Sequence, residues 1–165
     1  MEYLVRRAEM KDLGRIEEIY ACARSFMASN GNPHQWKNGF PPKELVQRDI
    51  AEGNLYAITD GDAVHGVFFF RIGEDPTYAV IQDGTWRSDR PYGTIHRIAG
   101  DGSGGILRTA VKFAKRQIDH LRIDTHHDNK VMRNALTKQG FHRCGIIHIE
   151  DGSPRIAYDR LAEDI

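Results

Sequence analysis

The feature that most constrains the fold of this chain is a run of glycines between a short strand and a helix. Residues 94–99, rich in β-branched side chains, predict a strand, and residues 106–118 predict a helix. Between them, residues 100–105 read Gly-Asp-Gly-Ser-Gly-Gly. Glycine at this density is entropically costly and usually marks positive φ angles or a close approach of backbone to ligand. The helix start adds unpaired N–H groups and partial positive charge, so the segment predicts an anion site, with phosphate the usual occupant.

Length and charge limit the classes of protein to consider. A chain of 165 residues fits one domain, residues 1–165, with a sizeable core. Lys+Arg and Asp+Glu both number 23, so no general attraction to nucleic acid or to a membrane surface is expected. The N-terminus has no long apolar run, which argues against a signal peptide or a membrane span. The two cysteines form no disulfide framework, and we therefore expect a cytoplasmic protein.

The order of the predicted elements indicates an α/β fold with a mixed, mostly antiparallel sheet. Antiparallel strands dominate the first half, and the second half forms a β-α-β-α-β unit. A central β-α-β unit is therefore expected to be flanked by helices. Strands are predicted at 3–6, 55–59, 63–71, 94–99, 121–124, 141–148 and 155–159, and helices at 10–29, 43–52, 106–118 and 129–139.

Three kinds of phosphate binding could use the glycines. Gly100, Gly102 and Gly105 match the G-x-G-x-x-G pattern of dinucleotide-binding folds, and Asp124 ends the next strand about twenty residues later. That fold needs several further βα units, whereas the chain ends soon after and hairpins precede the motif. A Walker-type loop is excluded because no Gly-Lys-Ser/Thr follows. Binding of the coenzyme A pyrophosphate fits the order strand, glycine loop, helix, strand, helix.

Two segments together carry a resemblance to a known family. Residues 105–108, Gly-Ile-Leu-Arg, align with the end of a pyrophosphate loop of the form Arg/Gln-x-x-Gly-x-Gly/Ala and the residue after it. Residues 129–141 match Asn-x-x-Ala-x-x-Leu-Tyr-x-Lys-x-Gly-Phe, most clearly at their Lys-x-Gly-Phe end. In this order and spacing the chain resembles the GNAT superfamily of N-acetyltransferases over nearly its whole length. The resemblance implies a single-domain GNAT-like fold and acetyl-CoA as the cofactor.

The resemblance also implies which residues bind the coenzyme, including a backbone N–H near the end of the central strand that polarises the thioester carbonyl. The expected set is Ile98, Ala99, Gly102, Ser103, Gly104, Gly105, Ile106, Arg108 and Asn129. Three features depart from the family. No Arg or Gln opens the loop at the usual distance, and Gly102 and Ser103 stand there instead. Leu107 stands where a small residue normally lets the helix approach phosphate, and Leu136 replaces the tyrosine that protonates the departing thiolate in many relatives. A thiol with a pKa of about 8.5 can leave without an acid, and a general acid contributes about 10²–10⁴-fold.

A base is still needed, because an amine attacks only when it is neutral. His96 lies on the central strand near the expected acyl group, and His126 follows the adjacent strand and would act through water. Asp124 would orient either histidine. The alternative interpretations are a structural strand histidine and a strand-end aspartate that caps a turn. No metal site is expected among the neighbouring histidines, because they lack ligand spacing.

The acceptor pocket is predicted from position in the fold. Trp36 and Phe40 lie in a Gly/Asn/Pro-rich loop after the first helix, where the family shapes this pocket, and Tyr92 and Arg155 lie in segments expected near the same cleft. We therefore predict direct acetyl transfer, in a ternary complex, to a primary amine of a small molecule or a peptide N-terminus. The alternatives are a non-catalytic acyl-CoA-binding or regulatory domain and a dinucleotide-binding domain. The sequence is compatible with a homodimer.

Overall fold

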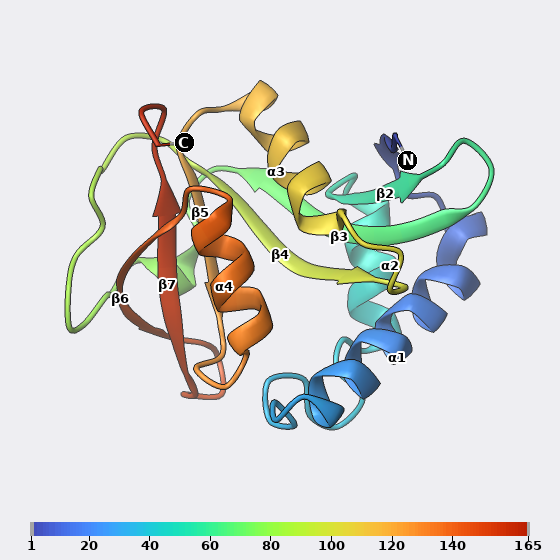
Figure 1. Ribbon diagram of the computed structural model, residues 1–165, viewed down its shortest axis with the longest axis horizontal. Helices are drawn as coiled ribbons and strands as arrows, with labels where there is room; N and C mark the ends of the chain where they lie inside the picture. The colour runs from blue at the N-terminus through green and yellow to red at the C-terminus, as the bar shows by residue number, and fades with distance from the viewer. Residues whose placement is uncertain (1, 165) are drawn as a thin grey trace.

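A computed structural model describes residues 2–164, which contain one sheet with the strand order β1-β2-β3-β4-β5-β7-β6. Neighbouring strands pair antiparallel except β4 and β5, which are parallel (Figure 1). This confirms the predicted α/β class with a mixed, mostly antiparallel sheet. The strands are β1 (Leu4–Arg7), β2 (Leu55–Thr59), β3 (Val64–Ile72), β4 (Gly93–Gly100), β5 (Leu121–Thr125), β6 (His142–His148) and β7 (Pro154–Arg160).

Helices cover both faces of the sheet, and the alternation of side chains along β3 separates the two layers. Phe68 and Phe70 pack in the cluster that α3 and α4 complete, whereas Val67 points to the cluster formed with α1 and α2.

No helix within residues 2–164 is long and apolar enough to span a membrane. The α-helices are α1 (Leu13–Ser29), α2 (Lys43–Ala51), α3 (Ile106–Gln117) and α4 (Lys130–Lys138), and the 3₁₀ helices are η1 (Met10–Asp12) and η2 (Pro76–Tyr78).

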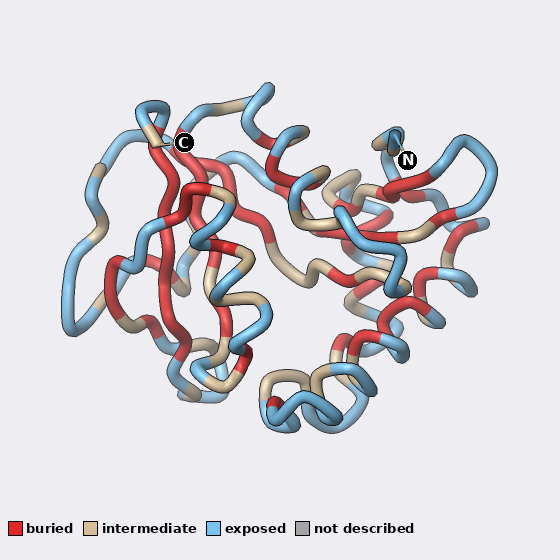
Figure 2. Tube along the Cα trace, in the orientation of Figure 1, coloured by how far each residue is buried: buried red, intermediate tan, exposed pale blue. Residues whose placement is uncertain are grey.

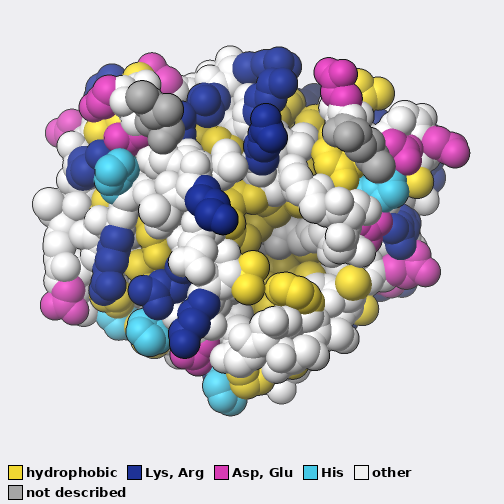
Figure 3. Space-filling model, viewed as in Figure 1, with side chains coloured by type: hydrophobic (Ala, Val, Ile, Leu, Met, Phe, Trp, Pro, Cys, Tyr) yellow, Lys and Arg dark blue, Asp and Glu magenta, His cyan; other side chains and the backbone are white. Residues whose placement is uncertain are grey.

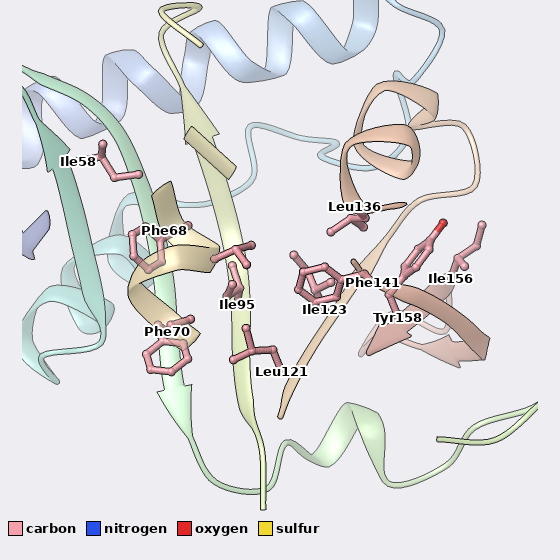
Figure 4. Close-up of a cluster of buried hydrophobic side chains, with 13 residues drawn as sticks. Ile58, Phe68, Phe70, Ile95, Leu121, Ile123, Leu136, Phe141, Ile156 and Tyr158 are labelled. Carbon is pink, nitrogen blue, oxygen red and sulfur yellow. The ribbon is translucent and has the colours of Figure 1, made fainter. Parts of the chain in front are cut away.

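The buried residues follow the periodicities seen in the sequence. Ile16 and Tyr20 face inward from α1 at helical spacing, and Ala110 and Ala114 do so from α3. Figure 2 shows burial concentrated in the strands and on the inner sides of the helices. Figure 4 shows the larger cluster, in which Leu136 of α4 joins side chains of the central strands. The core therefore lies on both sides of the sheet and fixes its centre.

Strands β4 and β5 separate soon after they meet. Only Gly93 with Leu121 and Thr94 with Arg122 are paired, and beyond them the two strands diverge (Figure 1). At the same point β4 contains a bulge, because two of its residues lie opposite one residue of β3. Arg97 is the bulged residue, with a φ of 48°. The sheet thus opens in its middle, between the two parallel strands.

Ion pairing and packing hold the bulge in place. The guanidinium of Arg97 donates to both carboxylate oxygens of Asp49, at 2.8 and 3.0 Å, and lies 4.6 Å from the ring centroid of Phe69. The hydroxyl of Tyr20 donates to the Arg97 carbonyl at 2.9 Å. Helices α1 and α2 therefore each contribute a contact that fixes the backbone where β4 leaves β5.

Candidate active site

A cleft of about 1100 Å³ lies where β4 and β5 diverge. Its walls include Ile98 and Ile123, which belong to the layer of α3 and α4, and also His96 and Asp124, which lie on the opposite face. The opening therefore passes between the two strands. Figure 3 shows a hollow lined by hydrophobic side chains on this side of the molecule. The loop after α1, helix α2 and the β6–β7 hairpin complete the rim.

His96 stands between two carboxylates at the edge of this opening. Its Nε2 lies 2.7 Å from Oδ2 of Asp75, and its Nδ1 lies 3.8 Å from Oδ2 of Asp124. The same oxygen of Asp124 accepts a hydrogen bond of 2.7 Å from the hydroxyl of Tyr78. Of the predicted catalytic residues, the structure therefore brings His96 and Asp124 together.

Asp75 was not predicted, and its position follows from local capping. It precedes Pro76 at the start of η2, and its Oδ1 accepts hydrogen bonds from the N–H and hydroxyl of Thr77. Burial alone would raise the pKa of Asp75, but hydrogen bonds from His96 and Thr77 outweigh it and hold that pKa well below its usual range. The Asp-Pro pair signals a cap in the sequence, but nothing local links it to a histidine 21 residues away.

Burial keeps the Tyr78 hydroxyl protonated. Burial, and then the nearby carboxylate of Asp124, raises the pKa of Tyr78 well above its ordinary value. The phenol is therefore a stable donor to Asp124, and it fixes the orientation of that carboxylate beside His96.

Tyr92 does not lie where we expected. It is buried away from the cleft, stacked against Arg122, whose guanidinium carbon is 3.9 Å from the ring centroid. Its hydroxyl accepts a hydrogen bond of 2.7 Å from the N–H of Asp75. Tyr92 was expected to line the acceptor pocket, but it is buried just before the two residues of β4 that pair with β5 and is not part of the cleft wall. Tyr92 thus contributes to the site indirectly, by holding the backbone of Asp75.

The glycine loop forms a cradle of exposed backbone. Gly102, Gly104 and Gly105 have φ angles of 94°, 85° and 75°. A Cβ at Gly102 or Gly104 would meet no atom within 4 Å, so these positions serve the backbone conformation and leave space beside it. Helix α3 begins at Ile106 with no capping side chain among the described residues, which leaves its first-turn N–H groups for an anion.

Side chains around the loop have structural roles. Asp101 accepts hydrogen bonds from the N–H and hydroxyl of Ser103, and its other oxygen lies 2.8 Å from Nδ1 of His65 and 2.9 Å from Nη2 of Arg15. The Ser103 hydroxyl thus points to Asp101 in this structure. Gly100 has a different role, since a Cβ there would approach Cγ1 of Ile106 to 2.7 Å. Arg108 is exposed on the first turn of α3, and Ala99 is buried on the opposite side of β4 from Ile98.

Asn129 both caps α4 and ties down the loop after α1. Its Oδ1 accepts from the N–H of Met132 at 3.1 Å, and its Nδ2 donates to Oε1 of Gln35 at 3.0 Å. It also lines the cleft. On the same helix, Leu136 is fully buried, so no acidic group stands at this position.

His126 lies outside the cluster around His96. Its Nδ1 accepts a hydrogen bond of 3.0 Å from the N–H of Asp128. Burial, and then the positive charge of Arg155, lowers the pKa of His126. The neighbouring His127 is exposed, and across residues 2–164 no group of three or more His, Cys, Asp or Glu side chains is arranged to hold a metal ion.

The remaining predicted residues line the cleft from the loop after α1 and from β7. Trp36 packs against Tyr20, with ring centroids 5.5 Å apart, and against Phe40 at 6.2 Å. Arg155 enters the wall from β7. An aromatic surface and a buried guanidinium therefore flank the histidine and its carboxylates.

Comparison with solved structures identifies the fold. A GNAT-family acetyltransferase from Streptococcus agalactiae is 26% identical, with 98% of this chain and 96% of that chain covered and a TM-score of 0.87. The ribosomal-protein-S18-alanine N-acetyltransferase of Escherichia coli is 14% identical and has a TM-score of 0.63, and the alignment covers 99% of this chain and 96% of that chain. The PaiA N-acetyltransferase of Thermoplasma acidophilum, in complex with coenzyme A, is 13% identical and has a TM-score of 0.66, and the alignment covers 98% of this chain and 99% of that chain.

Sequence comparison alone is less informative. No family model matches the chain, and no curated protein matches it either. The two structures below 25% identity share the fold of this chain over nearly its whole length. The family assignment rests on the streptococcal protein, which aligns over nearly the whole length of both chains. The chain is a member of the GNAT superfamily of acetyltransferases.

Proposed function

We propose that this protein transfers an acetyl group from acetyl-CoA to a primary amine by direct attack in a ternary complex. As a GNAT acetyltransferase it is an acyltransferase with acetyl-CoA as its cofactor. The observation that carries the finer proposal is the position of His96, held between two carboxylates at the opening between β4 and β5. Bound acetyl-CoA would supply a thioester whose carbonyl carbon accepts the amine.

The glycine loop fits the coenzyme pyrophosphate. Its positive-φ glycines leave open space beside exposed N–H groups, and the start of α3 adds partial positive charge. Arg108 supplies a full positive charge on the first turn. Ile98, beside the bulge at Arg97, lines the cleft where the thioester would lie. Phosphate would thus be bound mainly by backbone N–H groups.

His96 is suited to remove a proton from the amine. A carboxylate only accepts hydrogen bonds, so the bond to Asp75 places the ring proton of neutral His96 on Nε2. Nδ1 is then an unprotonated acceptor in the cleft. After it takes a proton, Asp75 and Asp124 stabilise the imidazolium from both sides. We therefore assign His96 as the base, Asp75 as its positioning residue and Asp124 as the second stabilising charge.

Departure of the thiolate is proposed to proceed without a protein acid at the usual position. Leu136 is buried there and carries no proton. The thiol has a pKa of about 8.5, so its anion is a tolerable leaving group near neutral pH. Holding the amine and thioester in line would supply most of the acceleration.

The proposal is tested by two measurements on the same protein. Acetyl-CoA should raise the melting temperature, and coenzyme A thiol should appear when a panel of primary amines is added. The buried Leu136 keeps a non-catalytic acyl-CoA-binding domain as the second candidate. Stabilisation without thiol release, even at high pH, would favour that candidate. Stabilisation by NAD but not by acetyl-CoA would contradict both.

A further inference from the structure

Arg155 is a buried cation in the wall of the cleft. Its residue is 4% exposed, and it lines the same opening as His96 and Asp124. Nη1 donates to the carbonyl of Pro154 at 2.9 Å and Nη2 donates to the carbonyl of Gln35 at 3.2 Å. A guanidinium carries five N–H groups, so these two bonds leave donors unused. Within residues 2–164 no carboxylate lies at ion-pair distance from it, although Asp124 and Asp151 act on it from further away.

The other buried or half-buried arginines differ in their surroundings. Arg97 is paired with Asp49, and Arg87 is paired with Asp159. Arg122 lies between the rings of Trp86 and Tyr92, at 4.0 and 3.9 Å from their centroids. Arg160 donates to two carbonyls outside the cleft. Among the buried arginines in the described range, Arg155 is the one that lines the cleft.

A charge in this position is unfavourable unless a ligand compensates it. Burial is the main influence on Arg155 and lowers its pKa. Holding an unpaired cation away from water costs free energy, and hydrogen bonds to two neutral carbonyls offset only part of that cost. A carboxylate matches the planar fork of a guanidinium and would bind there with charge-assisted hydrogen bonds.

The register of the sheet places this cation close to the reacting groups. Asp124 of β5 pairs with Ala157 of β7, so its side chain projects from the same face as that of Arg155, two residues along β7. Such diagonal neighbours lie about 7–8 Å apart, with their Cβ atoms somewhat closer together. An amine beside His96 and Asp124 and a carboxylate at Arg155 would therefore be separated by only a few bonds.

We propose that Arg155 binds a carboxylate of the acceptor, so that the substrate is a small amino carboxylate such as a free amino acid. This inference rests on the proposed acetyl transfer at His96 and narrows its acceptor class. The N-terminus of a protein has no free carboxylate beside its amine and would leave Arg155 unpaired. The loop after α1 limits space at this end, because Gln35 bonds to both Arg155 and Asn129.

The first test compares free L-amino acids with their carboxamides in the thiol-release assay on the wild-type protein. A charge-assisted bond to Arg155 predicts a kcat/KM about tenfold to a hundredfold higher for the carboxylate. Arg155→Gln should abolish this preference mainly through KM, and Arg155→Lys should restore part of it. Arg160→Gln is the matched control, since Arg160 is a buried arginine of the same strand outside the cleft, and it should keep the preference.

A second measurement separates this inference from the proposed function. Binding of the N-acetyl derivatives of the same amino acids to protein saturated with coenzyme A should be detected by calorimetry and lost in Arg155→Gln. Equal kcat/KM for amino acids and carboxamides in the wild type would overturn the inference and leave acetyl transfer intact. Absence of thiol release with every amine would contradict the proposed function, and the calorimetric result would still decide the role of Arg155.

Discussion

The proposed acetyl-CoA site has two ends, the glycine loop and the region around His96, and they offer a ligand different chemical groups. At the glycine loop the groups offered to a ligand are backbone N–H groups on exposed residues, with few side chains near them. At the opposite end, His96 and its partners are side chains fixed by hydrogen bonds of 2.7 Å that join distant parts of the chain. The loop therefore depends on backbone conformation, and the histidine end depends on the tertiary fold. Substitutions at the two ends should fail in different ways.

The largest effect is expected at the histidine end. His96→Ala removes the proposed base and should lower kcat by about 10²–10⁴-fold while the KM for acetyl-CoA changes little. His142→Ala is the control, because His142 is an exposed histidine of β6 that pairs with Asp164 at 3.2 Å. A large loss in His126→Ala and none in His96→Ala would move the base to the other candidate.

The next effect tests what holds the bulge beside His96. Asp49→Ala leaves the guanidinium of Arg97 without its partner in a site where Asp49 is 2% exposed. The free energy of unfolding should fall by about 3 kcal/mol, measured by urea denaturation. Glu52→Ala removes an exposed ion pair in which Glu52 lies 3.9 Å from Arg48. This variant should change the free energy of unfolding by less than about 0.5 kcal/mol. Similar losses in the two variants would contradict this account of the bulge.

A matched pair of glycine substitutions examines the loop end. Gly104→Ala forces a φ of 85° on a residue with a Cβ and should lower stability by about 1 kcal/mol. Gly14 lies in α1 with no atom within 4 Å of an added Cβ, so Gly14→Ala should raise stability by about 0.5–1 kcal/mol. The melting temperatures should therefore move in opposite directions. A rise in both would mean that the loop does not need glycine at this position.

The smallest effect concerns the pH dependence of the contact between His65 and Asp101, which holds the glycine loop in place. Hydrogen bonds that the His65 ring donates to Asp60 and Asp101 raise the pKa of His65. A raised pKa means that the contribution of charged His65 is fully present below the unfolded value of about 6.5 and is lost as pH rises through the folded value. The wild type should exceed His65→Gln by about 1–3 °C in melting temperature at pH 6, and the difference should shrink by pH 9. A difference that grows with pH would contradict this anchoring.

The same contrast explains what could be predicted from the sequence. The strands, helices and glycine loop carry local signals, such as inward-facing Ile16 and Tyr20 or the cap at Asn129, and the structure contains them. The predicted helix at 10–29 differs only in beginning with the 3₁₀ turn η1. These elements depend on neighbours a few residues apart.

The side-chain site carries no such local signal. Asp75 and Tyr78 reach His96 and Asp124 only because η2 folds back over the sheet. The bulge at Arg97 depends on Asp49, 48 residues away. The prediction that Tyr92 lines the cleft fails for the same reason. The direction of its side chain depends on how β4 pairs with β5 and not on its neighbours in the sequence.

The central claim is that one cofactor spans both ends, with phosphates at the loop and the reacting group beside His96. A crystal structure of the protein with coenzyme A tests this most directly. We predict the pyrophosphate against the N–H groups of Gly104, Gly105 and the first turn of α3, with the sulfur between β4 and β5 next to His96. A coenzyme bound elsewhere, or a sulfur out of reach of an amine held at His96, would contradict the account.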